Sequence, residues 1–283
     1  MTAIVGLVIV VVIVFGGFQL SGGHLTLIFE PWHEYLIIVG AAIGGLIVKS
    51  SPRTLKLMVS KLGESFKGKL PDKETYLDSL KLIHDLAYLA RREGLLALEG
   101  HVQNPEASAI FSKYPGILAN QQLMRFLTDN LKIVVVGGTN PTDLENLMDT
   151  DIETIEEENA TPQLLLANTA DALPALGIVA AVLGIIKTMA SIAEGPEVVG
   201  TKVAAALVGT FLGVLFSYGF VGPLAMNIEM ANLEHMRVLE VFKTGILGIT
   251  RGMNPKLSAE YARRAIYDGM RPSFEELETT LKG

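Results

Sequence analysis

The sequence predicts an all-α membrane protein with four transmembrane helices and a helical cytoplasmic domain. Three observations support this fold class: the composition, four long apolar stretches, and helical spacing in the polar part. The 283 residues are 49% hydrophobic and 19% charged, with a mean hydropathy of +0.40, whereas soluble domains average about 25% charged. Yet 23 basic and 30 acidic residues are too many for a chain buried wholly in a bilayer. A substantial water-exposed portion is therefore expected.

Four stretches approach the roughly 20 apolar residues that a membrane-spanning helix needs. They run from 3 to 20, from about 35 to 48, from 172 to about 190, and from 203 to 224. Trp32 and Tyr35 would anchor the short second stretch at the membrane surface. The first stretch could instead be a signal peptide, but residues 1–29 lack the basic start that such a peptide needs. A buried core helix is the alternative for the others, mainly for the second.

The distribution of basic residues predicts the orientation in the membrane. Residues 1–48 contain no Lys or Arg, whereas six basic residues follow directly, namely Lys49, Arg53, Lys56, Lys61, Lys67 and Lys69. Basic residues are again frequent after residue 224. Because cytoplasmic segments carry the excess of Lys and Arg, residues 49–171 and 225–283 are expected inside the cell. Both termini are then cytoplasmic, and only the connections near 21–33 and 191–202 face the other side.

These expectations divide the chain into four parts. Residues 1–48 hold the first two transmembrane helices, 49–171 a cytoplasmic helical domain, 172–224 the third and fourth transmembrane helices, and 225–283 cytoplasmic C-terminal helices.

The residue patterns of the polar segments predict helices. Leu82, Leu86 and Leu89 recur at helical spacing, and Ser273 with Glu276 forms a capping-box pattern that would begin a last helix. Residues 143–158 contain eight acidic side chains and no basic one. A solvated helix face is the expected role of that run.

No signature of an enzyme, a metal site or a nucleic-acid binder is present in the sequence. The phosphate-binding loop, the serine-nucleophile elbow and the zinc-protease motif are absent, and the five histidines lack ligand spacing. A net charge of −7 argues against binding nucleic acid. With no cysteine there is no disulfide framework. No enzymatic activity, cofactor or metal is therefore expected.

The third and fourth stretches are distinguished by small residues rather than by charge. Small side chains at helical spacing form one face on each stretch, with Gly177, Ala180, Ala181 and Gly184 on the third, and Ala206, Thr210, Gly213 and Ser217 on the fourth. Such faces allow close helix contact. They serve either to pack the two helices or chain copies together, or to line a channel around a guest helix. If protons are conducted, the carboxylate that carries them is expected from another subunit, since Lys187 is the one ionisable residue within these stretches and lies near an end.

The chain resembles the MotA family of flagellar motor stator proteins, within the group that also includes ExbB and TolQ. The matching motifs extend over the whole chain: FGGF at 15–18, SGGHL at 21–25, GAAIG at 40–44, NP at 104–105, IFSKYP at 110–115, LPALGIVAAVLG at 173–184, VGTFLG at 208–213 and RPSFEELE at 271–278. The resemblance implies a proton channel of the inner membrane that generates torque. It implies a homopentamer around a dimer of MotB, which supplies the ion-carrying Asp and the peptidoglycan anchor.

The resemblance also assigns roles to individual residues. It implies that Arg91 and Glu99 contact the rotor switch protein FliG, and that Pro174 and Pro223 couple ion passage to movement. Arg91 and Glu99 would share one surface of a helix, since eight residues correspond to about 80°. Solvated charges, an N-terminal helix proline at Pro174 and a helix terminator at Pro223 are the structural alternatives.

The ion pathway is expected beside Ala181, Thr210, Ser217 and Tyr218. Thr210 and Tyr218 match channel-facing positions of the family, whereas Ser217 is proposed for its hydroxyl. Ala181 stands where sodium-driven relatives carry a hydroxyl, and a hard cation needs several oxygen ligands. Protons are therefore the expected ion.

Three other functions remain open from the sequence. An ExbB/TolQ-type energiser of outer-membrane transport is disfavoured by the large cytoplasmic segment and the tail. A stand-alone solute transporter needs a midplane substrate site that these helices hardly offer. A membrane-anchored interaction scaffold is the third.

Overall fold

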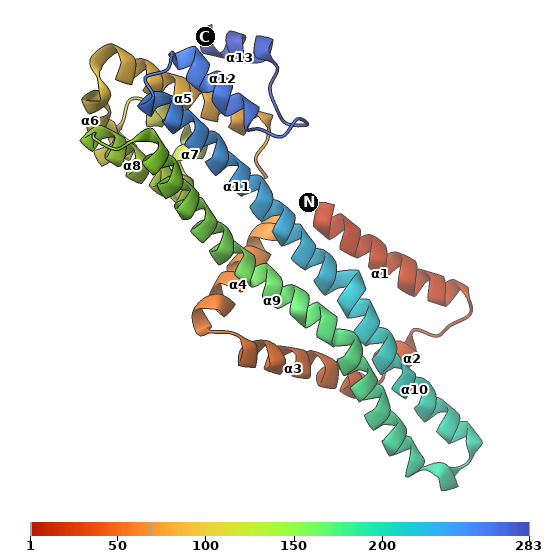
Figure 1. The fold of residues 1–283 in the computed structure, drawn as a ribbon. Coiled ribbons are helices and arrows are strands. Elements are labelled where there is room, and N and C mark those ends of the chain that lie inside the picture. Colours follow the sequence, from red (N-terminus) through yellow and green to blue (C-terminus); the bar gives the residue numbers. More distant parts are fainter. Residues whose placement is uncertain (1, 68–69, 283) are drawn as a thin grey trace. The chain divides into compact units, whose positions relative to one another are not determined.

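The computed structural model describes residues 2–67 and 70–282, and these form two compact units. The first unit comprises the described residues of 1–68 and 159–231, and the second those of 69–158 and 232–283. Every regular element in the described part of the chain is helical (Figure 1). Lys69, one of the basic residues that predicted the orientation, lies outside the described residues.

Four helices in the described part of the chain are long and apolar enough to cross a membrane, and all four lie wholly or partly in the first unit. Its elements are α1 (Thr2–Leu20), α2 (Thr26–Phe29), α3 (Trp32–Lys49), α4 (Pro52–Lys67), part of α9 (Pro141–Met189), a short η4 (Ile192–Glu194), α10 (Pro196–Val214), a π-helix η5 (Leu215–Val221) and the start of α11 (Gly222–Thr250). None of the 18-residue apolar window of α1 is buried within the chain. The predicted fold class is confirmed, and the second span begins at Trp32, three residues before the start expected from the sequence.

Two of these helices are much longer than the sequence suggested. Helix α9 continues for 49 residues through Pro162 and Pro174, and α10, η5 and α11 together form one helical run of 55 residues. Pro174 is therefore an interior proline and not the N-terminal one considered above. The apolar window found by hydropathy begins at residue 172, but a helix can continue through a polar sequence when its backbone hydrogen bonds remain satisfied.

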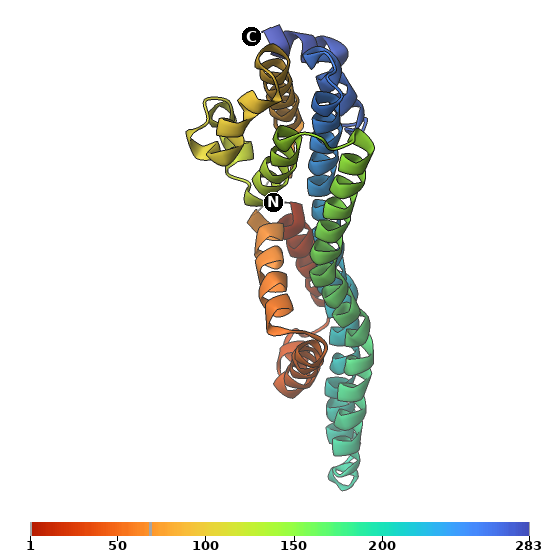
Figure 2. The same cartoon turned by 60° about the vertical axis from the view of Figure 1, so that its left-hand side comes forward.

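The second unit is a bundle of helices (Figure 2), and its buried side chains form one hydrophobic core cluster. Its elements are α5 (Lys73–Glu93), η1 (Leu95–Leu98), α6 (Glu99–Gln103), η2 (Pro105–Ala107), η3 (Phe111–Lys113), α7 (Pro115–Leu118), α8 (Gln121–Val136), the first part of α9, the second part of α11, α12 (Pro255–Arg264) and α13 (Phe274–Lys282). Leu82 and Leu86 are fully buried and the partly buried Leu89 packs against the same core cluster, which confirms the predicted helical stripe. Helix α5 contacts α12 and α13.

A half-buried carboxylate connects α5 with the short helices that follow it. Burial alone would raise the pKa of Asp85, but hydrogen bonds from His84, Lys113 and Tyr114 outweigh it and hold that pKa below its ordinary value. The Lys113 ammonium and the Tyr114 hydroxyl both donate to Asp85 Oδ2 at 3.1 Å. Asp85 thus ties α5 to the segment before α7.

The acidic run at 143–158 lies on α9, with its apolar side in the core. Leu144, Met148 and Ile152 are buried, while most of the acidic side chains are exposed, as predicted for a solvated face. Two of them do more than solvate the helix. Asp149 accepts from Lys243 at 2.6 Å, and Glu145 accepts from Arg251 at 3.0 Å, which joins α9 to α11.

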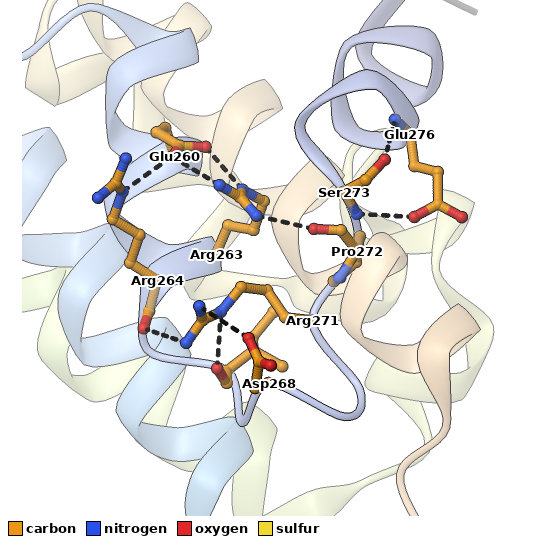
Figure 3. A network of polar contacts seen from close by, with 9 residues as sticks. Glu260, Arg263, Arg264, Asp268, Arg271, Pro272, Ser273 and Glu276 are labelled. Carbon is orange, nitrogen blue, oxygen red and sulfur yellow. Dashed lines mark hydrogen bonds and ion pairs between the residues drawn. The ribbon is translucent and has the colours of Figure 1, made fainter.

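The C-terminal tail is held by a polar network (Figure 3). Glu260 on α12 accepts from Arg263 Nε at 2.7 Å and Arg263 Nη2 at 2.8 Å, and Arg263 Nη1 donates to the carbonyl of Pro272 at 2.8 Å. Ser273 and Glu276 exchange reciprocal bonds between side chain and backbone N–H, at 3.1 and 2.7 Å. The predicted capping box at the start of α13 is confirmed.

Candidate functional site

The small-residue faces of α9 and α10 pack against each other within one chain. A Cβ atom built on Gly177 would lie 2.7 Å from the carbonyl oxygen of Gly209, and one built on Gly213 would lie 2.6 Å from the carbonyl oxygen of Leu173. Real Cβ atoms essentially never come that close to backbone. The glycines are therefore what allows the two backbones to approach. Packing between these helices, one of the two alternatives left open by the sequence, is realised here.

The four residues expected along the ion pathway do not share one environment in the single chain. Ala181 and Ser217 are buried, at 5% and 1% exposure, Thr210 is half-buried, and Tyr218 is 70% exposed. Tyr218 and Pro223 line a hollow of about 230 Å³ against α1. The tyrosine thus faces α1 and the surroundings rather than α9.

Pro223 lies just after a π-helical segment, within a continuing helix. The N–H of Gly222 donates to the carbonyl of Ser217, five residues back, which is the π pattern. A proline ring clashes with the carbonyl four residues before it, here that of Gly219, and the wider π turn relieves this clash. The helix then continues to Thr250, so the interpretation of Pro223 as a terminator is wrong. Single π turns often occur at functional sites.

A buried carboxylate at the start of α3 was missed by the sequence argument. Glu34 is 7% exposed and, among the described residues, is the one charged side chain in the buried class. A Cβ atom on Gly184 would lie 3.1 Å from Glu34 Oε1, and one on Gly209 would lie 2.8 Å from Oε2. Its carboxyl therefore lies against α9 and α10. The apolar stretch that the sequence predicts begins at about residue 35, one position after this glutamate.

Arg91 and Glu99 are both exposed, but they are not on one helix. Helix α5 ends at Glu93, Gly94 follows with φ +89°, and Glu99 begins α6. The 80° argument from a continuous helix is therefore wrong, because a residue with that φ ends an α-helix and glycine adopts it without strain. Glu99 accepts from Gln103 at 2.9 Å. Both side chains remain open to a partner.

In the described part of the chain, no group of three His, Asp or Glu side chains is placed to hold a metal ion.

Comparisons with known proteins agree over the whole chain. Residues 4–94 match the family described as "Motility protein A N-terminal", and residues 118–238 match the "MotA/TolQ/ExbB proton channel family". "Motility protein A" of Salmonella typhimurium is 37% identical over 278 residues, which cover 98% of this chain and 94% of that protein. "Chemotaxis protein LafT" of Vibrio parahaemolyticus is 36% identical over 281 residues, which cover 99% of this chain and 98% of that protein. The fold is similar to that in the "Structure of C. jejuni MotAB", with a TM-score of 0.80 at 22% identity over 96% of this chain and 98% of that one.

Proposed function

The chain belongs to the motility protein A family, within the MotA/TolQ/ExbB proton channel family, and on this premise we propose that it is the stator subunit of a bacterial flagellar motor. The observation that carries the proposal is 37% identity over 98% of the chain to a motility protein. Its role is ion transport and force generation, not enzymatic catalysis. Relatives with motility and chemotaxis names do not favour an energiser of outer-membrane transport or a passive scaffold.

The working unit is an oligomer of this chain with a MotB-type partner in the inner membrane. Solved MotAB complexes share the fold. The partner would be a dimer that supplies the ion-carrying Asp and the peptidoglycan anchor, and five copies of this chain would surround it. The guest helix would meet an uncharged surface of α9 and α10, because the apolar side chains Ile178, Val182 and Leu207 are exposed there.

The orientation of the chain in the membrane is inferred from its basic residues. Lys49 ends α3, and Arg53, Lys56 and Lys61 follow on α4, whereas residues 1–48 carry no basic residue. By the positive-inside rule both termini would lie in the cytoplasm, and the connections near 21–33 and 191–202 would lie outside. Protons would enter at those connections.

Protons rather than sodium ions are favoured by the chemistry of α9. Ala181 packs against Gly209 and offers no oxygen ligand, and a sodium site would need several oxygens. Protons would pass beside Ala181, Thr210, Ser217 and Tyr218 to the partner's Asp. Neutralising that Asp removes the cost of a charge in a low-dielectric site, so its two protonation states would prefer different arrangements of the ring.

The prolines would convert this preference into movement. Pro174 and Pro223 interrupt backbone hydrogen bonding in α9 and in the run from α10 to α11, so each helix can bend there at little cost. The exposed Arg91 and Glu99 would transmit the step to the rotor switch protein FliG through complementary charges. Their exposure supports this contact.

The test is swimming by a strain that lacks this gene. We expect flagellated cells that do not swim, and complementation whose swimming stops when the proton gradient is collapsed but not when the sodium gradient is. Swimming that requires only the sodium gradient would reject the proton assignment. Unimpaired swimming in a strain with no second stator would reject the stator function.

A further inference from the structure

Glu34 lies where an ionised carboxylate is poorly stabilised. It is in the first turn of α3, 7% exposed, and its Oε2 atom has no hydrogen-bond partner within the described residues. Removing an ionised carboxylate from water costs on the order of several kcal/mol. A protonated carboxyl is neutral and avoids this cost. The site therefore favours proton uptake.

The chain is built around this carboxyl. Gly184 on α9 and Gly209 on α10 leave the space that the two carboxyl oxygens occupy, since a Cβ on either would come within 3.1 Å of them. Three membrane-spanning helices thus converge on one ionisable group. Ionisable residues within membrane spans usually mark an ion pathway.

The carboxyl is also reached from the loop end of the spans. Glu34 lines a hollow of about 410 Å³ bounded by the α2–α3 connection and by α9 and α10. The other titratable side chains on this hollow are Glu30 and His33 from the α2–α3 side, Lys187 from α9 and Lys202 from α10. Lys202 is engaged by Ser191 and by Glu194 at 3.1 Å. Water in the hollow can bring protons to Glu34.

We propose that Glu34 is a proton-binding site of this chain itself, loaded from the hollow before protons reach the carboxylate on the partner helix. A hydronium ion in the hollow transfers its proton to a carboxylate oxygen of Glu34 and leaves water. The neutral Glu34 later returns that proton to a water molecule on the channel side and becomes a carboxylate again. This inference rests on the proposed proton-driven stator function.

The first experiment measures swimming speed against external pH in cells that carry the complete stator. Glu34→Gln keeps the side-chain volume but cannot take up a proton, so speed should fall and lose its dependence on external pH. Glu34→Asp keeps a carboxyl group, so it should recover part of the swimming speed and part of its dependence on external pH. Glu30→Gln is the matched control, because Glu30 lines the same hollow but is exposed, and it should behave as wild type.

Two outcomes would overturn the proposal while leaving the stator function intact. One is wild-type speed and pH profile in Glu34→Gln. The other is a slower motor whose pH profile is unchanged, because this would make Glu34 a packing residue only. Failure of the proposed proton-driven stator function would instead be seen as unimpaired swimming without this gene, or as swimming of the complemented strain that ignores the proton gradient.

A second measurement uses the wild-type complex and therefore does not require that a substituted protein folds. Infrared difference spectra of the wild-type complex at near-neutral pH, where exposed carboxyls are ionised, should contain the carbonyl stretch of a protonated carboxyl. That band should shift when glutamate, and not aspartate, carries ¹³C at its side-chain carboxyl. Absence of a glutamate-sensitive band would refute proton binding at Glu34.

Discussion

Replacing Gly213 by alanine tests the contact between the α9 and α10 backbones. The added Cβ would lie 2.6 Å from the carbonyl oxygen of Leu173 and 2.8 Å from the Cα of Gly177. Ordinary van der Waals contact begins at 3.4 Å, so the two helices must separate by about 0.8 Å at this level. Neither obstacle is a flexible side chain. Overpacking of this kind costs about 1–3 kcal/mol.

A control on the same helix separates packing from helix propensity. Gly200 also lies on α10, but a Cβ there meets nothing within 4 Å. Both substitutions gain about 1 kcal/mol of helix propensity, so the difference between Gly213→Ala and Gly200→Ala isolates the packing cost. Thermal unfolding of the purified complex in detergent should place Gly213→Ala lower by several degrees, at about 2–4 °C per kcal/mol. Equal melting temperatures would refute the glycine-mediated contact.

Three further substitutions address function, acid stability and the tail. Pro223→Ala should leave the complex as stable as wild type or more so, since proline costs about 3 kcal/mol in a helix interior, yet swimming should be lost; a motile, fully functional variant would reject the coupling role. Despite its burial, Asp85 has a pKa held below its ordinary value of 3.8 by hydrogen bonds, so its stabilisation is complete above about pH 4 and disappears as the pH falls through the lowered pKa. Asp85→Asn should therefore flatten acid unfolding and cost about 1 kcal/mol or more at neutral pH, whereas Asp129→Asn, in an exposed ion pair, should change neither. Glu260→Gln should speed hydrogen exchange in α13, because it loosens the arginine that holds the Pro272 carbonyl, and exchange as slow as in the exposed-site control Glu275→Gln would contradict this.

The sequence predicted the elements whose signals are local. Apolar length identified the four spans, leucine spacing identified α5, and the Ser273–Glu276 pattern identified the cap of α13. Each of these depends on residues within a few turns of one another. The family motifs then supplied the function.

Features that depend on contacts between residues distant in the chain, or on one backbone angle, could not be predicted from the sequence. Helix α5 ends because one residue, Gly94, adopts a φ of +89°. The π turn before Pro223 depends on how a long helix accommodates a proline, which hydropathy does not register. Glu34 was missed because a carboxylate at the edge of an apolar window resembles an interfacial charge. Its burial becomes evident only when α9 and α10 are packed beside α3.

Gly209 lies where helix packing and the buried carboxylate meet, and a double-substitution cycle can measure their coupling. A Cβ on Gly209 would lie 2.8 Å from Glu34 Oε2, 3.1 Å from the backbone N of Ala181 and 3.2 Å from the Cβ of Ala180. Truncating Glu34 to alanine removes the shortest of these contacts. Gly209→Ala should therefore cost less in the Glu34→Ala background, with a coupling of about 0.5–3 kcal/mol. Gly213→Ala, whose three nearest atoms belong to Leu173 and Gly177, should add independently to Glu34→Ala. Additive melting shifts for both glycines would mean that the carboxyl does not occupy the space left by Gly209.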